Sequence, residues 1–254
     1  MDHASDIGIS TSAYTELMLP AALERIAELA PAAEIRSFGL HTLLSRRNRL
    51  AAQAAGLTYT VHGPFGYTGI WDLDEDERLK ALDEHRRHLE ASAAIGARLY
   101  VTHPDWRPGL AGRDAAVVAA LERSFERLLP WQDEYGVEVV VENMPGAGRS
   151  HFAHPGDLDL RGLGLVLDVG HANISGCLDE WLSEPQAPLR HLHVHDNNGE
   201  GDDDDPHLGL GAGVIDAAAV MAAARAAGAS VVLENDREDD LLASLAHLRE
   251  LGLL

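Results

Sequence analysis

Short apolar runs alternate with longer amphipathic segments along almost the whole chain. The apolar runs are nearly continuous in Val, Ile and Leu, which is typical of strands buried on both faces, as in a parallel sheet covered by helices. We expect strands over residues 7–10, 34–39, 58–63, 98–104, 137–143, 163–171, 189–196 and 230–236.

The segments between these runs carry apolar residues at the three- and four-residue spacing of a helix. We expect helices over residues 18–30, 42–55, 76–95, 114–134, 214–228 and 239–251. The fifth and sixth helices are the weakest, and residues 144–162, which are rich in Gly, Pro and polar residues, are expected to be mostly loop. Eight strand-then-helix units in 254 residues predict an α/β fold, a single (β/α)8 TIM barrel domain over residues 1–254. The alternative, a doubly wound open sheet, is disfavoured because no G-x-G-x-x-G motif follows the first strand.

Six successive strands end in a residue that can bind a metal ion. These residues are His62, His103, Glu142, Asp168 with His171 three residues later, His193 with His195, and Glu234. The carboxyl ends of barrel strands converge on one face, where the chemistry of such folds lies. Strand ends are often polar, and with 41 Asp and Glu and 14 His a single match would mean little. Six matches in succession predict a shared site on that face.

Carboxylates and imidazoles crowded at one face would repel one another or titrate abnormally without a cation, so we expect a divalent metal as cofactor. A mixed set of His and carboxylate ligands suits Zn, Mn, Fe or Co, and a more oxygen-rich subset suits Mn or Mg. Cys177 is the only cysteine, which excludes a zinc site built on several cysteines and an internal disulfide.

The formal net charge is −21, and Lys80 is the only lysine. Such a surface repels polyanions, so nucleic acid is an unlikely partner and a small molecule is expected instead. No apolar run is long enough to cross a membrane and the first residues do not resemble a signal peptide, so we expect a cytoplasmic protein. A homo-oligomer remains possible.

The motifs at the strand ends together resemble those of one known superfamily. VHGPF, VTHP, VVVEN, LVLDVGH, HVHDN, DPHLGLGAG and VVLEND, between residues 58 and 236, are similar to the xylose isomerase-like TIM barrels. That superfamily includes sugar phosphate isomerases and epimerases and the endonuclease IV-like enzymes of AP endonuclease family 2. The resemblance implies four metal ligands shared by the isomerase branch, Glu142, Asp168, His193 and Glu234. The fuller, three-metal set of the endonuclease IV branch would add His62, His103, His171, Asp205 and His207, so one to three ions per chain are expected.

Two positions depart from the ketose 3-epimerases of this superfamily. Gly148 stands where they have a second substrate-binding glutamate, and Gly199 stands where they have an arginine. These departures put a simple ketose 3-epimerase in doubt, and hydroxyl contacts to a sugar would have to come from elsewhere.

Our leading hypothesis is a metal-dependent isomerase or epimerase of a sugar or related polyhydroxy carbonyl compound, acting by proton transfer through an enediolate. Glu142 and Glu234 would remove and return the proton, and His171, His195 and Trp106 would contact the substrate. The alternative is a multi-metal phosphodiester hydrolase of the endonuclease IV type, for which the net charge disfavours DNA as substrate. A third hypothesis is a non-catalytic metal-binding barrel.

Overall fold

Eight parallel strands close into a barrel, with β1 paired to both β2 and β8. The computed structural model describes residues 7–64, 69–107, 112–146, 148–199 and 205–254. The strands are β1 Ile7–Ser10, β2 Ala32–Arg36, β3 Thr58–His62, β4 Leu99–Thr102, β5 Glu138–Glu142, β6 Gly164–Asp168, β7 Leu189–Val194 and β8 Ser230–Leu233. The barrel confirms the predicted fold class.

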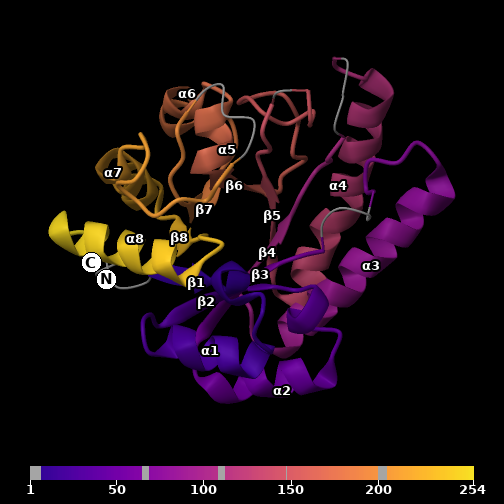
Figure 1. Ribbon diagram of the computed structural model, residues 1–254. Helices are drawn as coiled ribbons and strands as arrows, with labels where there is room; N and C mark the ends of the chain where they lie inside the picture. Colours follow the sequence, from indigo (N-terminus) through magenta and orange to yellow (C-terminus); the bar gives the residue numbers. More distant parts are fainter. Residues whose placement is uncertain (1–6, 65–68, 108–111, 147, 200–204) are drawn as a thin grey trace.

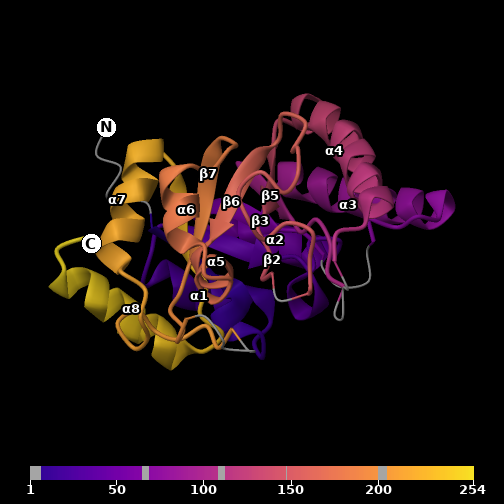
Figure 2. The same ribbon diagram turned by 90° about the horizontal axis from the view of Figure 1, so that it is seen from above.

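Helices surround the barrel and cover the outer face of its strands (Figures 1 and 2). They are α1 Leu19–Ala27, α2 Arg46–Ala55, α3 Glu75–Ala94, α4 Ala115–Tyr135, α5 Val169–Ile174, α6 Leu178–Ser183, α7 Ala217–Ala227 and α8 Glu238–Glu250, with short 3-10 turns at η2 Thr11–Tyr14 and η3 Gly39–His41. The described residues between β5 and β6 contain no helix, which confirms the predicted loop. None of the described helices is long and apolar enough to cross a membrane.

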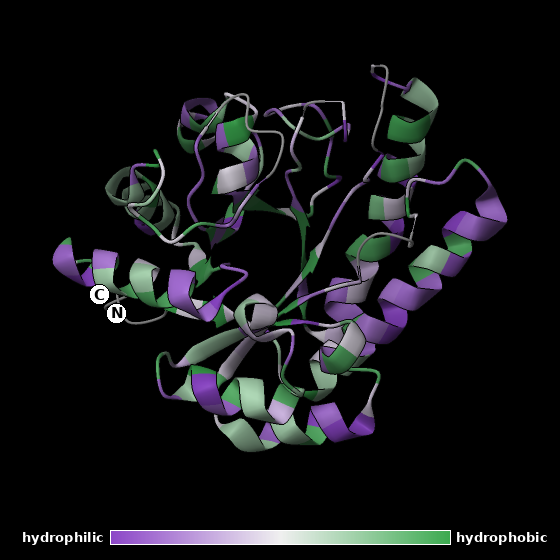
Figure 3. Cartoon of the chain, in the orientation of Figure 1, coloured by the Kyte–Doolittle hydropathy of each residue, from purple (hydrophilic) through white to green (hydrophobic). Residues whose placement is uncertain are grey.

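Each strand presents alternate residues to the helices and to the interior of the barrel, because side chains on a strand alternate between its two faces. The outward-facing residues, such as Val139 and Val141 on β5, join one large apolar core with the helices. The apolar colour of the strands in Figure 3 reflects this layer. The interior holds a small apolar cluster of Leu99, Val101, Val140 and Val166. The remaining inward positions include polar residues at several levels, and these build the site.

Candidate functional site

Four predicted ligands from four neighbouring strand ends converge inside the barrel. Glu142, Asp168, His193 and Glu234 are all buried, and each offers one ligand atom within 4.8 Å of the others. The centre of the group is His193 Nδ1. It lies 2.8 Å from Glu234 Oε2, 3.3 Å from Glu142 Oε1 and 3.9 Å from Asp168 Oδ2. We call these four residues the central cluster.

The donor atoms of the central cluster fit a divalent cation. Three carboxylates face one imidazole nitrogen, a mixed oxygen and nitrogen set that Mn²⁺, Zn²⁺ or Co²⁺ accepts. Among the described residues, Asp168 Oδ2 and His193 Nδ1 are buried and have no hydrogen-bond partner. Since buried polar atoms in proteins are nearly always paired, two orphaned ligand-type atoms in one cluster indicate a position for a cation.

The electrostatics of the cluster favour positive charge at its centre. Burial lowers the pKa of His193, but the carboxylates of Glu234, Glu34 and Glu142 outweigh burial and raise this pKa well above its ordinary value. Burial raises the pKa of Glu142 and of Glu234, but the histidines around them together outweigh burial, His193 and His103 at Glu142 and mainly His193 at Glu234, so both pKa values lie below the usual range. The two glutamates are therefore ionised at neutral pH.

A second group lies beside the central cluster and shares Glu142 with it. His62 Nε2 and His103 Nε2 lie 3.1 Å apart, and they lie 3.2 Å and 3.1 Å from Glu142 Oε2. His62 ends β3, and His103 follows the last residue of β4. These two predicted strand-end residues are thus brought to the same carboxylate.

A third group forms around Asp205 in the loop after β7. His195 Nε2 lies 3.0 Å from Asp205 Oδ1, and the ring of His207 stacks on that of His195 with centroids 3.9 Å apart. His171 Nε2 lies 3.9 Å from Asp205 Oδ2. Asp168 connects this group to the central cluster, because its Oδ1 lies 3.9 Å from His195 Nε2.

Three of these histidines are oriented in the same way. The Nδ1 atoms of His62, His171 and His207 lie 2.9, 2.9 and 2.6 Å from backbone carbonyl oxygens, those of Gly63, Asn143 and Glu234. A hydrogen bond from Nδ1–H to a carbonyl places the lone pair on Nε2, which is how proteins commonly orient histidines that bind metals. Nε2 of His62 then lies near Glu142, and Nε2 of His171 lies near Asp205.

The junction of β6 and α5 positions Asp168 and His171. Asp168 Oδ1 accepts a hydrogen bond from His171 N and caps α5, while the side chain of Asn143 bonds both the N–H and the C=O of Asp168. Gly170 lies between Asp168 and His171, within α5. Its lack of a side chain matters for space, because a Cβ there would overlap the His195 ring.

Trp106 lies outside all three groups. It is 37% exposed, and its ring faces the Arg149 guanidinium at 5.8 Å. Its predicted contact with substrate stays a prediction. Gly148 and Gly199 both have positive φ, a backbone conformation that glycine adopts easily. As glycines they have no side chain in the place of the glutamate and the arginine that the resemblance to ketose 3-epimerases implies.

Sequence reasoning missed two interior residues, Glu34 and His191. Both are fully buried below the central cluster, and Glu34 lies 3.0 Å from Nε2 of His191 and 3.0 Å from Nε2 of His193. The available signal was a lone carboxylate inside the otherwise apolar run of β2, and a histidine two residues before His193 on the same strand face.

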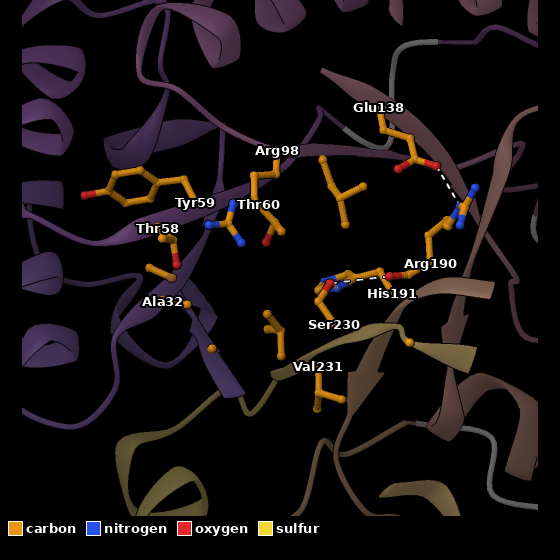
Figure 4. A pocket seen from close by; sticks show the side chains of 15 residues that line it. Ala32, Thr58, Tyr59, Thr60, Arg98, Glu138, Arg190, His191, Ser230 and Val231 are labelled. Atoms are coloured by element: carbon orange, nitrogen blue, oxygen red, sulfur yellow. Dashed lines mark hydrogen bonds and ion pairs between the residues drawn. The ribbon is translucent and has the colours of Figure 1, made fainter. Parts of the chain in front are cut away.

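A cavity of about 290 Å³ lies at the amino ends of the strands, away from the three groups (Figure 4). Thr58, Thr60, His191 and Ser230 line it, with Arg98 and Arg190 exposed beside them. The residues with ligand chemistry lie at the opposite ends of the strands, so we place the candidate site there and not in this cavity.

Residues 19–251 match the sequence model of a protein family described as "Xylose isomerase-like TIM barrel". The chain belongs to this family. It is 30% identical over 181 residues to the protein MJ1614 of Methanocaldococcus jannaschii, covering 69% of this chain and 72% of that protein. The superfamily resemblance suggested by the strand-end motifs is thereby confirmed.

Solved structures with the same fold cover nearly the whole chain. A D-tagatose 3-epimerase-like protein is 26% identical, with a TM-score of 0.84 and 96% of each chain covered. The TTHB071 protein of Thermus thermophilus, from a crystal soaked with ZnCl2, is 25% identical, with a TM-score of 0.69 and 97% of each chain covered. The 3-keto-D-glucoside 4-epimerase YcjR of E. coli is 23% identical, with a TM-score of 0.78 and 98% and 99% of the two chains covered, and shows the fold alone.

Proposed function

We propose that this protein is a divalent-metal-dependent isomerase or epimerase of a sugar or a related polyhydroxy carbonyl compound. The observation that carries the proposal is the central cluster, in which two ionised glutamates flank His193 and Asp168. The similarity to a D-tagatose 3-epimerase-like protein supports the same class of substrate.

The residues that would hold the principal cation are Glu142, Asp168, His193 and Glu234. When bound, the cation would polarise the substrate carbonyl and stabilise the negative charge that develops on its oxygen. Burial of all four side chains excludes bulk water from the reacting groups, which strengthens electrostatic interactions between them.

Glu142 and Glu234 are the proposed acid–base pair. Glu142 is the last residue of β5, and Glu234 follows the last residue of β8. Both contact His193 Nδ1, so a substrate over the cluster would have one glutamate on each side. One glutamate would remove the proton from the carbon next to the carbonyl. The other, after taking up a proton from solvent, would return a proton to that carbon or its neighbour, and the first would release its proton to solvent. Their ionised state at neutral pH suits the first step, in which a carboxylate accepts a proton.

Substrate contacts are proposed for His171 and His195 beside the cluster, and for the exposed Trp106, which lies outside it. Because Gly148 and Gly199 offer no side chain, the contacts that ketose 3-epimerases make at these places are missing here. The substrate is therefore proposed to differ from the simple ketoses of those enzymes.

A multi-metal phosphodiester hydrolase is the second candidate. It is favoured by the two further groups, in which His62 and His103 face Glu142, and His171 and His207 lie near Asp205. Such groups could hold additional cations that activate water and stabilise a leaving oxygen. The net charge of −21 opposes DNA as the substrate and leaves a small phosphodiester. A non-catalytic metal-binding barrel would use the same residues without turnover.

The test is to load the purified protein with Mn²⁺, Co²⁺, Mg²⁺ or Zn²⁺ and to incubate it with ketoses, ketose phosphates and keto-glycosides. Isomer formation that requires the cation and is lost in Glu234→Gln supports the proposal. Glu77→Gln, the same change at an exposed position of α3, is the matched control. Cleavage of a small phosphodiester or of an abasic-site duplex, without any isomer formation, would favour the hydrolase instead.

A further inference from the structure

Glu34 forms a buried support beneath the central cluster. It lies on β2, a strand that contributes no residue to the cluster, and its side chain is fully buried inside the barrel. Burying a carboxylate is costly unless specific partners compensate for it. Its partners are His193, His191 and Thr60, so the position of this carboxylate is tied to the histidine at the centre of the site.

The two oxygens of Glu34 face different partners. Oε2 accepts a hydrogen bond from Thr60 Oγ1 at 3.0 Å and lies 3.0 Å from His191 Nε2. Oε1 lies 3.0 Å from His193 Nε2 as an ion-pair contact, and among the described residues both of these buried atoms are without a hydrogen-bond partner. The first oxygen is therefore held in place, and the second is directed at His193.

His191 has its own partner at the end of the barrel where the strands begin. Its Nδ1 lies 2.7 Å from Ser230 Oγ, a contact drawn in Figure 4. The contacts thus run without interruption from Ser230 at the cavity, through His191 and Glu34, to His193 and Glu234. Residues of β2, β3, β7 and β8 take part, so the support is built by the barrel as a whole.

An imidazole has two nitrogens, and the partner of one determines what the other can do. His193 Nδ1 faces the three carboxylates of the cluster and needs a lone pair to bind a cation. That requires the hydrogen to be on Nε2, the atom that faces Glu34. A carboxylate in this position is the usual outer partner of a metal-binding histidine, because it fixes the tautomer and the ring orientation.

We infer that Glu34 is a positioning residue, which holds His193 with Nε2–H toward Glu34 and Nδ1 toward the cluster and so sets the affinity of the cluster for a divalent cation. The inference rests on the proposed function only in taking the central cluster as the cation site. It does not depend on which substrate is turned over.

The test measures cation binding directly. Isothermal titration with Mn²⁺ is carried out on wild-type protein, Glu34→Gln and Thr60→Val, with Thr58→Val as the matched control. Thr58 and Thr60 lie on the same face of β3, but Thr58 Oγ1 donates to Pro31 O and does not touch Glu34. Loss of an outer partner typically weakens metal binding about 10- to 100-fold, so Glu34→Gln should weaken Mn²⁺ binding by that factor. Thr60→Val should weaken it in the same direction but less, and Thr58→Val should leave it unchanged.

A spectroscopic measurement separates positioning from a general structural effect. In zinc-loaded protein with ¹⁵N-labelled histidine, His193 should show a protonated Nε2 and a metal-bound Nδ1. The Nε2–H resonance should move upfield in Glu34→Gln, because the charged carboxylate that faces Nε2–H is replaced by a neutral amide. In Thr58→Val it should stay in place.

The outcomes distinguish this inference from the proposed function. If the wild type binds no divalent cation, the proposed function fails and the inference fails with it. If the wild type binds Mn²⁺ and folded Glu34→Gln binds it equally well with an unmoved His193 resonance, the inference alone is overturned. Should Glu34→Gln not fold, Thr60→Val decides, because binding equal to that of Thr58→Val overturns the inference.

Discussion

Acidification should destabilise the barrel through two buried histidines of α3, the helix that packs beside β3 and β4. His85 and His88 are 1% and 2% exposed. Burial lowers the pKa of His85 to about 3, and burial together with the charge of Arg87 lowers the pKa of His88 to about 4. Both side chains are therefore neutral in the folded protein at neutral pH. His85 Nδ1 lies 2.9 Å from Tyr100 Oη on β4, so protonation disturbs the layer beneath the strand ends of the site.

The sign follows from the proton balance. An unfolded histidine has a pKa near 6.5, so below that value the unfolded chain binds protons that the folded protein does not bind. The free energy of unfolding thus falls as pH drops through 6.5, and it continues to fall until the folded pKa values are reached. At about 1.36 kcal/mol per pH unit and histidine, going from pH 7 to pH 5 costs about 2 kcal/mol for each residue and about 4 kcal/mol for both.

Histidines with raised pKa values act in the opposite direction as pH falls from 7 toward 6.5, but they are the same in all three proteins of the assay, so their contribution cancels in the comparison. The stability that His193 and His195 contribute is complete below pH 6.5, because it is lost only as pH rises through their folded pKa values. Carboxylates with lowered pKa values, such as Glu142 and Glu234, lose their contribution only as pH falls below the range of unfolded carboxyl groups, near 4.5.

The assay is urea unfolding at pH 7, 6 and 5 for the wild type, the double variant His85→Gln/His88→Gln and the control His154→Gln, an exposed histidine. The wild type and the control should lose about 4 kcal/mol more between pH 7 and pH 5 than the double variant loses. Equal losses in all three proteins would refute the assignment of neutral, buried histidines to α3.

Three further predictions concern the site and its supports. Gly170→Ala should lower the free energy of unfolding by about 1–3 kcal/mol in urea titrations, despite the better helix propensity of alanine, because the new methyl group overlaps the His195 ring and lies 2.7 Å from Asp205 Oδ2; unchanged stability would contradict the close packing there. Asp105→Ala should cost about 3 kcal/mol or more in the same assay, since it leaves three buried donors, Ser150 Oγ, His151 N and His151 Nδ1, without their acceptor; a loss below about 1 kcal/mol would contradict this. Removing divalent cations with EDTA should lower the melting temperature in calorimetry, because a ligand bound only by the folded state stabilises it, and an unchanged melting temperature would count against a bound cation.

The fold could be predicted from the sequence because every strand is a short apolar run and most helices have clear spacing. The errors lie at the ends of elements. Residues 34–39 were expected as the second strand, but β2 is Ala32–Arg36, because Ser37 and Phe38 already lead into the 3-10 turn η3. The expected strand 163–171 ends at Asp168, because Asp168 caps a helix that starts at the next residue.

The central cluster could be expected because a polar residue that closes an apolar run is visible in the sequence. Glu34 and His191 could not be assigned in the same way, because they lie within their strands. Their side chains meet in the interior only when the barrel closes, since β2 and β7 are not neighbouring strands. The group around Asp205 depends on the path of the loop after β7, which strand patterns do not determine. The metal-binding and catalytic roles of all these residues stay predictions.

Glu142 and Glu234 are proposed to transfer a proton at the carbon next to a substrate carbonyl. The direct measurement is deuterium incorporation at that carbon from D2O, followed by mass spectrometry, in cation-loaded wild type, Glu234→Gln and the control Glu77→Gln. We expect incorporation by the wild type and the control, and a loss of about 10²-fold or more in Glu234→Gln. Incorporation at the wild-type rate in Glu234→Gln would contradict this proposal.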